Sequence, residues 1–267
     1  MNPRLAAVFE TAAAEDRAAL IGYLPAGFPD HTSSIELFNA MTDAGVDAIE
    51  VGLPYSDPLM DGPAIQEAVS IALKSGTTTD VVLDILEQIS AHGATALVMS
   101  YWNPIERYGV LRFAERLASA HGVGVITPDL TPEEAGPWSA ATDAFGIDRV
   151  FLVAPSSTQV RIKTVTTATS GFVYAASTMG VTGARGQVSS AAPQLVARVR
   201  ESTRLPIAVG LGVSTGAQAK DVAQYADGVI VGSAFVNAIL QATDHSAALR
   251  AVTQLATELS AGVRGEA

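Results

Sequence analysis

The sequence predicts an α/β fold, a (β/α)8 TIM barrel, and its length and two repeating patterns lead to this class. The chain has 267 residues, close to the roughly 250 that such a barrel fills as one unit, so a single domain over residues 1–267 is expected. About eight short runs rich in Val, Ile and Ala recur, each almost wholly apolar, which is typical of parallel strands covered on both faces. A longer stretch with helical periodicity follows each run, as βα repetition requires.

The predicted strands begin at Ala19, Asp47, Ala96, Gly124, Asp148, Phe172, Pro206 and Gly228. Amphipathic helices are predicted over residues 34–44, 79–91, 111–120 and 217–226, with another from about residue 191. An additional N-terminal helix around residues 5–14 would plug or flank the bottom of the barrel. The intervals after the second and sixth strands are longer than the rest, which predicts extended loops at the carboxyl ends, where barrel enzymes build their sites.

The composition disfavours several classes of protein. The chain carries 16 basic and 27 acidic residues, a net charge of -11, which argues against a nucleic-acid partner. It has no Cys, so disulfides, thiolate nucleophiles and zinc-thiolate sites are excluded. We find no uncharged apolar window of about 18 residues and no signal peptide at the amino terminus, so we expect a cytoplasmic protein without a membrane partner.

The segment after the second strand holds two carboxylates in unusual settings. Glu50 stands within an otherwise apolar strand, where burial raises a carboxyl pKa and can prepare a general acid or base. The alternative is a structural carboxylate bonded to its neighbours. Asp61 lies among Pro58, Gly62 and Pro63, and by itself it could be only a turn or helix N-cap residue. The pairing of Glu50 with Asp61 favours catalysis by two carboxylates.

Glycine-rich segments follow the last three predicted strands, at residues 177–187, 210–214 and 231–234. At this place in a (β/α)8 barrel, bare glycine N–H groups and the N-terminus of a short helix hold a phosphate without needing Lys or Arg. A lone segment of this kind is usually a flexible surface loop. Three of them together predict a phosphate site, and the first could close over a bound ligand.

Aromatic residues occupy other strand ends. Tyr23, Tyr101, Trp102 and Tyr174 could line a pocket for a flat apolar group, although packing alone explains any one of them. The four histidines form neither a metal-ligand pattern nor a catalytic triad. The residues therefore predict an enzyme without metal or cofactor that anchors a phosphate at one end and works through two carboxylates at the other.

Five blocks of the sequence, in order, resemble the tryptophan synthase alpha chain family. They are residues 47–66 (DAIEVGLPYSDPLMDGPAIQ), 99–109 (MSYWNPIERYG), 128–130 (PDL), 151–155 (FLVAP) and 180–185 (GVTGAR). The resemblance implies the reversible retro-aldol cleavage of indole-3-glycerol phosphate to indole and glyceraldehyde 3-phosphate. Indole would pass to a beta subunit for L-tryptophan synthesis, and pyridoxal phosphate would belong to that partner.

The resemblance also implies roles for individual residues. Glu50 would shuttle protons, protonating the indole C3 and helping to take the proton from the glycerol hydroxyl. Asp61 would accept a hydrogen bond from the indole N–H and stabilise the positive charge that develops on the ring. The implied substrate-binding residues are Tyr23, Tyr101, Tyr174, Thr182, Gly183, Gly212, Gly232 and Ser233. Within that set the glycines and Ser233 would hold the phosphate, and Thr182 would bond Asp61 when the sixth loop closes.

An α2β2 heterotetramer is expected on the same grounds, with an interface that includes Asp57, Pro58, Asn103 and Pro104. The rigidity of these proline-containing segments equally suits loop packing alone. Met60 stands where the family usually has a small residue, and residues 177–180 (STMG) are an uncommon entry to the sixth loop. Neither departure removes a reacting group.

Three other interpretations stay open beside an alpha subunit whose turnover is slow until a beta subunit closes its loops. One is a free-standing lyase on the same scaffold that releases indole to solvent. Another is a catalytically silent subunit that activates a partner, against which the presence of both Glu50 and Asp61 counts. The third is a different phosphate-binding barrel, such as a sugar-phosphate isomerase, for which the segment after the second strand would be unexpected.

Overall fold

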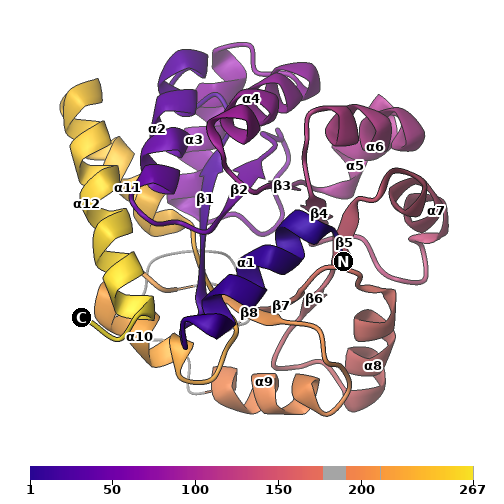
Figure 1. Cartoon of the computed structure of the whole chain (residues 1–267). Coiled ribbons are helices and arrows are strands. Elements are labelled where there is room, and N and C mark those ends of the chain that lie inside the picture. Colours follow the sequence, from indigo (N-terminus) through magenta and orange to yellow (C-terminus); the bar gives the residue numbers. More distant parts are fainter. Residues whose placement is uncertain (177–190, 211, 267) are drawn as a thin grey trace.

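The computed structural model describes residues 1–176, 191–210 and 212–266, which form a parallel β-sheet surrounded by helices (Figure 1). The order of strands along the sheet is β5-β4-β3-β2-β1-β9-β8-β7-β6. The strands are β1 (Ala19–Pro25), β2 (Ala48–Gly52), β3 (Ala96–Met99), β4 (Gly124–Ile126), β5 (Asp148–Val150), β6 (Leu152–Val153), β7 (Val173–Ala176), β8 (Ile207–Gly210) and β9 (Gly228–Val231). All eight predicted strand positions are occupied.

The two ends of this order belong to one stretch of chain, so the sheet closes on itself. β5 pairs with β4, β6 pairs with β7, and only Phe151 separates β5 from β6. The Phe151 carbonyl accepts a bond from the Tyr174 amide at 3.2 Å, which continues the ladder. Neighbouring strands of a barrel are staggered, so β4 meets the first half of this stretch and β7 the second. The predicted (β/α)8 barrel is confirmed, with its fifth strand divided.

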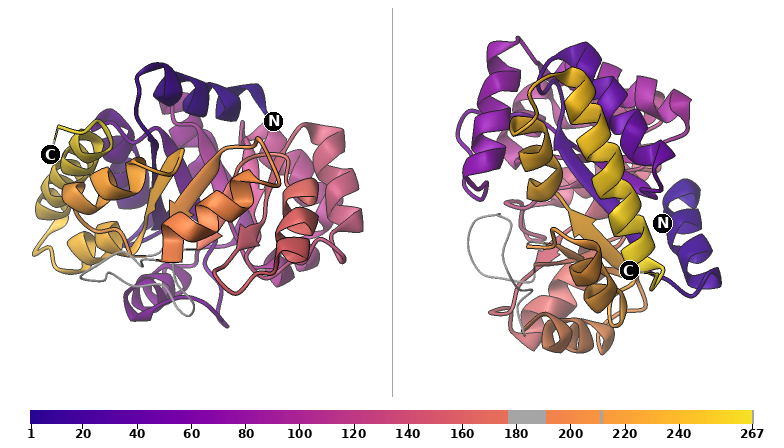
Figure 2. Two further views of the ribbon diagram at one scale, coloured as in Figure 1. Left: turned by 90° about the horizontal axis from the view of Figure 1, so that it is seen from below. Right: turned by 90° about the vertical axis from the view of Figure 1, so that its left-hand side faces the viewer.

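Helices follow the strands around the outside of the barrel (Figures 1 and 2). They are α1 (Pro3–Ala14), α2 (His31–Asp43), α3 (Pro63–Lys74), α4 (Thr79–His92), α5 (Trp102–Tyr108), α6 (Val110–Ser119), α7 (Gly136–Phe145), α8 (Gln159–Ala168), α9 (Ala191–Arg200), α10 (Gly216–Ala223), α11 (Ser233–Leu240) and α12 (His245–Val263). None of the helices in the described residues is long and apolar enough to cross a membrane.

The extension after the second strand is largely helical, although the sequence predicts an extended loop there. α3 occupies its second half, starting at Pro63, whose fixed φ suits the first turn of a helix. One face of α3 is buried through Ile65, Ala68, Val69 and Ala72. The loop between β2 and α3 covers residues 53–62, and Asp61 directly precedes the helix cap.

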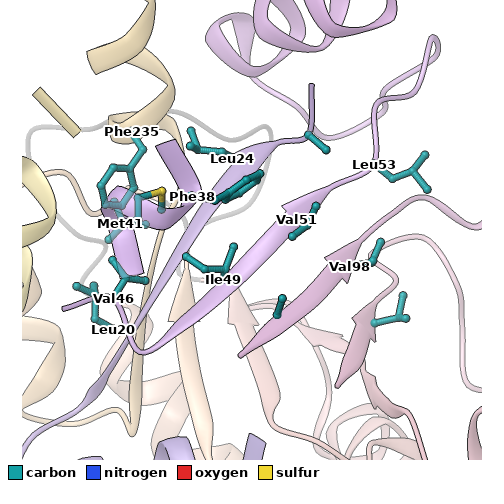
Figure 3. Packing of buried hydrophobic residues seen from close by; sticks show 14 of the residues in the cluster. Leu20, Leu24, Phe38, Met41, Val46, Ile49, Val51, Leu53, Val98 and Phe235 are labelled. Atoms are coloured by element: carbon teal, nitrogen blue, oxygen red, sulfur yellow. The ribbon is translucent and has the colours of Figure 1, made fainter. Parts of the chain in front are cut away.

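Two sets of buried side chains lie on opposite faces of the sheet. The outer set packs the strands against the helices, and Figure 3 shows part of it, including Ile49 and Val51 of β2 with Phe38 and Met41 of α2. The inner set fills the barrel. Successive side chains of a strand alternate between faces, so Ile49 and Val51 point outward and Glu50 points into the barrel.

The N-terminal helix α1 covers the end of the barrel where the strands begin. Its Leu5 and Phe9 belong to the inner core, and the ring of Phe9 lies 5.6 Å from that of Phe172. Arg4 donates to the carbonyls of Ala94 and His121, which precede β3 and β4. Figure 2 shows α1 on one side of the sheet. The predicted plug at the bottom is thus present, and the carboxyl ends of the strands form the opposite mouth.

Candidate active site

Glu50 lies inside the barrel, near the carboxyl end of β2. It is paired in register with Tyr23 of β1 and Leu97 of β3, and its side chain is 2% exposed. Its Oε1 has no hydrogen-bond partner among the described residues. Burial raises the pKa of Glu50 from 4.5 to about 8 because the charged form loses its hydration. Glu50 is therefore protonated at neutral pH and poised to exchange a proton.

Asp61 lies between β2 and α3 and faces the mouth of the barrel. Partial burial raises its pKa, and a hydrogen bond donated by the Tyr101 hydroxyl opposes that rise. The N-cap residue of α3 is Gly62, so the alternative in which Asp61 only caps a helix is wrong. The carboxylate is instead one wall of a pocket.

This pocket lies at the mouth of the barrel, and Asp61 but not Glu50 is among the residues that line it. Its polar lining residues are Tyr23, Asp61, Ser100, Tyr101 and Tyr174. The rest of the wall is mostly apolar and comes from Leu53, Met60, Val69, Met99, Pro128 and Leu152. A few polar groups in an apolar wall suit a flat aromatic ligand that carries one hydrogen-bond donor.

Tyr23 and Tyr174 lie near Glu50, and burial raises the pKa of both hydroxyls well above the usual value. The Glu50 carboxylate adds to both shifts, and Asp61 adds more than Glu50 does to the shift of Tyr23. Glycines at strand ends make room for them. A Cβ built on Gly52 would lie 2.6 Å from the Tyr23 hydroxyl, and one on Gly210 would lie 2.1 Å from the Tyr174 hydroxyl. Gly210, at the start of a predicted phosphate-binding segment, therefore shapes the tyrosine pocket.

The predicted phosphate-binding residues Gly232 and Ser233 form the N-terminus of α11, which begins directly after β9. Gly232 is the N-cap residue, and its lack of a side chain leaves the first N–H groups of α11 without a side-chain cap. A Cβ on Gly232 would lie 3.2 Å from Tyr23 Cδ1, so this helix end adjoins the tyrosine that stands beside Glu50. An anion here would sit at the positive end of a helix dipole and next to the pocket.

The remaining residues predicted to bind the substrate follow β8 and β7 in the sequence. Gly212 has φ +106°, a conformation that other residues rarely adopt, so a side chain at this position would strain the turn after β8. Thr182 and Gly183 lie outside the described residues.

The residues predicted at a partner interface lie on the same mouth of the barrel. Asp57 is exposed and accepts a bond from Ser56 Oγ at 2.5 Å. Asn103, at the start of α5, is exposed and donates from Nδ2 to the Tyr55 hydroxyl at 2.7 Å. Pro58 and Pro104 are half-buried. Asp57 and Asn103 thus make local hydrogen bonds and remain accessible.

Sequence reasoning missed most of the apolar wall of the pocket. Met99 and Leu152 occupy strand positions that alternate with outward-facing residues, so the two-residue period of β3 and β6 could have indicated them. Met60 could not be placed in this way because it lies in a loop, and its N–H is bound to the Tyr101 hydroxyl at 2.9 Å. In the described part of the chain, no group of three His, Asp or Glu side chains could hold a metal ion.

The chain is similar in sequence and in structure to several known proteins. The family model described as "Tryptophan synthase alpha chain" matches residues 9–264. The alpha chain of Thermobifida fusca is 59% identical over 96% of both chains, and that of Acidothermus cellulolyticus is 58% identical over 94% of this chain and 93% of its own. A solved tryptophan synthase of Mycobacterium tuberculosis superposes with a TM-score of 0.93, at 53% identity and 99% coverage of both chains. The alpha chain structure from Legionella pneumophila gives a TM-score of 0.85 at 31% identity, over 98% of this chain and 97% of its own.

Proposed function

We propose how the reaction runs in this site from one premise, that the chain belongs to the tryptophan synthase alpha chain family. The chain is therefore a carbon–carbon lyase that cleaves indole-3-glycerol phosphate to indole and glyceraldehyde 3-phosphate. The indole goes to a beta subunit, to which pyridoxal phosphate belongs. The cleavage itself needs a proton donor and acceptor, a group that stabilises charge on the ring, and an anchor for the phosphate.

Glu50 is the proton donor and acceptor of the reaction, and its environment carries this assignment. A carboxyl with a pKa of about 8 is protonated at neutral pH, so it can protonate the indole C3, a carbon base that water protonates poorly. Having lost that proton, the carboxylate stands without a hydrogen-bond partner on Oε1 in the described structure. It can then take the proton of the glycerol hydroxyl.

Asp61 binds the indole N–H and stabilises the positive charge that C3 protonation places on the ring. Its partial exposure and the bond from Tyr101 favour the ionised form more than the closed surroundings of Glu50 do. The two carboxyl groups thus have different environments, which suits a division of roles between them. The apolar wall formed in part by Met99 and Leu152 would hold the ring between them.

The steps balance without water or an added reactant. The proton of Glu50 moves to C3, and the ring becomes an indoleninium held by Asp61. Glu50 then removes the hydroxyl proton from the adjacent glycerol carbon, the bond from C3 to that carbon breaks, and its electron pair restores the aromatic ring. The products are indole and an aldehyde, and Glu50 is protonated again.

The phosphate of the substrate binds the N-terminus of α11 at Gly232 and Ser233, close to Gly212. Its two negative charges suit the positive end of the helix dipole. Tyr23 lies between this end and Glu50, so it spans the region that the glycerol chain would cross. We place the substrate with its phosphate at α11 and its indole ring in the tyrosine-lined pocket.

The beta subunit would bind the mouth of the barrel through Asp57, Pro58, Asn103 and Pro104 in an α2β2 assembly. These residues lie in the segments that also carry Asp61 and Tyr101. A partner seated there would contact the catalytic segments directly, which gives a physical route for it to speed the cleavage.

Steady-state release of indole from indole-3-glycerol phosphate tests the proposal, with the purified chain alone and then with a beta subunit. The expected result is a slow rate that rises at least tenfold with the partner, equivalent to ~1.4 kcal/mol of barrier. A high rate that is indifferent to the partner would instead identify a free-standing lyase. The absence of indole in both assays would identify a silent subunit and overturn the assignments to Glu50 and Asp61.

A further inference from the structure

Two segments of the chain cross the mouth of the barrel next to each other, and their contacts reach from an exposed side chain to Asp61. One segment runs from Leu53 to Asp61 after β2, and the other from Met99 to Asn103 after β3. The Leu53 N–H donates to the Met99 carbonyl at 2.9 Å, which fixes the start of the first segment on the second. The contacts farther along involve Tyr55, a residue outside the wall of the indole pocket.

Tyr55 contacts the second segment in two ways. Its hydroxyl accepts a bond from Asn103 Nδ2 at 2.7 Å. Its ring lies 5.6 Å from that of Tyr101, at an angle of 43°. Ring contacts of this geometry are favourable, and the hydrogen bond to the hydroxyl fixes the orientation of the Tyr55 ring relative to that of Tyr101.

Tyr101 in turn holds the segment that carries Asp61. Its hydroxyl accepts the Met60 N–H at 2.9 Å and donates to the Asp61 carboxylate. The same oxygen therefore orders the backbone just before Asp61 and the carboxylate itself. A shift of the Tyr101 ring would disturb both bonds together.

We propose that Tyr55 is a positioning residue for Asp61, acting through the ring of Tyr101 and locked in place by the amide of Asn103. The inference rests on the role proposed for Asp61 in the cleavage. It adds a route by which events at the exposed start of α5 reach the carboxylate, because Asn103 is accessible from outside while the other contacts lie deeper. Tyr55 touches neither the reacting atoms nor Glu50, so its effect on the rate is indirect.

The start of α5 is suited to relay such an effect. The Trp102 N–H donates to Asp129 Oδ1 at 2.8 Å, and the Trp102 ring packs 5.8 Å from that of Trp138. These contacts tie the residue before Asn103 to the next unit of the barrel, formed by β4 and α7. A partner that engages the Asn103 side chain can thus strengthen or replace the bond to Tyr55 without moving the helix.

The variant Tyr55→Phe tests the proposal because it keeps the ring and removes only the hydroxyl. We expect kcat for indole release to fall about three- to tenfold, with KM within about twofold, because Asp61 acts on the transition state more than on binding. Tyr108→Phe is the matched control, since it removes a hydroxyl that bonds Asp80 on the outer surface. Both variants should unfold at temperatures close to that of the unchanged chain.

A double-mutant cycle with Asn103→Ala identifies the route. In the isolated chain, Tyr55→Phe and Asn103→Ala should each lower kcat by a similar factor, and the double variant should be no worse than either alone. The inference would be overturned if the double variant lowered kcat by the product of the two single factors. It would also be overturned if Tyr55→Phe had the same kcat as Tyr108→Phe. Asp61→Asn separates this outcome from failure of the proposed function. If Asp61→Asn is inactive while Tyr55→Phe has normal activity, only the inference about Tyr55 fails. If Asp61→Asn is active, the role proposed for Asp61 in the cleavage fails as well.

Discussion

At the residue scale, the proposed chemistry of this protein depends on one carboxyl group that the barrel buries away from water. The flanking residues of β2 point outward into the core, so alternation leaves Glu50 no place but the interior. Its high pKa results from that placement. The same burial should affect both the rate of cleavage and the stability of the fold.

Glu50→Gln should abolish cleavage while leaving substrate binding nearly intact, because the amide keeps the shape of the side chain but has no proton to give. The measurement is kcat and KM for indole release, together with direct binding of the substrate to the variant. More than about a tenth of the original kcat, a change of less than ~1.4 kcal/mol in the barrier, would contradict the assignment.

The stability of the fold should depend on pH through the same residue. The pKa of Glu50 is about 8 in the folded chain and 4.5 when unfolded, so the unfolded state loses the proton first. Stability is therefore lost as pH rises from about 4.5 to 8. Glutamine does not titrate, so the Glu50→Gln variant escapes this loss. Its free energy of unfolding, relative to that of the unchanged chain, should therefore rise by about 2 kcal/mol between pH 5.5 and 7.5.

Urea unfolding of both proteins at the two pH values checks this expectation. Glu115→Gln is the control, since Glu115 is exposed on α6 and should show no such growth. If the free energies of unfolding of Glu50→Gln and the unchanged chain differ by the same amount at both pH values, the fold does not hold Glu50 protonated.

At the element scale, the proposed phosphate site consists of the N-terminus of α11 and the turn after β8, and it uses no charged side chain. This arrangement relies on backbone groups, so glycine is needed where the ligand approaches. Gly232 caps α11 and lies against Tyr23, and Gly212 has the positive φ that other residues avoid.

Gly212→Asp should weaken binding of the phosphate-bearing substrate by more than tenfold, with a smaller effect on kcat. The carboxylate would repel the phosphate and fill the space through which it approaches. Gly212→Ala is the matched control, because it introduces the same backbone strain without the charge. The KM of the substrate and the inhibition constant of inorganic phosphate report the difference. Equal losses in the two variants would place the phosphate elsewhere.

At the scale of the whole molecule, the barrel has an inner core that its strands share and that α1 completes. Phe9 belongs to that core, with its ring against Phe172 and only 7% of its surface exposed. The proposed active site lies at the opposite mouth. Stability and catalysis should therefore respond separately to changes at the α1 end.

Phe9→Ala should cost about 3–5 kcal/mol of folding free energy, since it removes a large buried side chain and leaves a cavity. Below its unfolding transition, the variant should keep kcat and KM within about twofold. Urea unfolding and steady-state kinetics on the same preparation measure both. A loss of less than about 1 kcal/mol would mean that α1 does not seal the barrel.

Much of the fold could be read from the sequence because it is written in local patterns. Apolar runs and the glycines that separate them located every described strand, and Glu50 was conspicuous as a carboxylate in the interior of such a run. The division of the fifth strand at Phe151 and the helix α3 were not predicted. Both depend on how neighbouring strands and helices stagger against each other, which no local pattern records.

The sequence by itself determined the barrel, the two carboxylates and the glycine-rich ends of the last strands, because periodicity and residue type are local properties. Only the tertiary structure decided which groups meet. It set Tyr101 against Met60 and Asp61, placed Tyr55 between Asn103 and Tyr101, and buried Glu50 away from solvent. Such contacts join residues far apart in the chain, and they result from closure of the sheet, which brings the carboxyl ends of all its strands to one mouth.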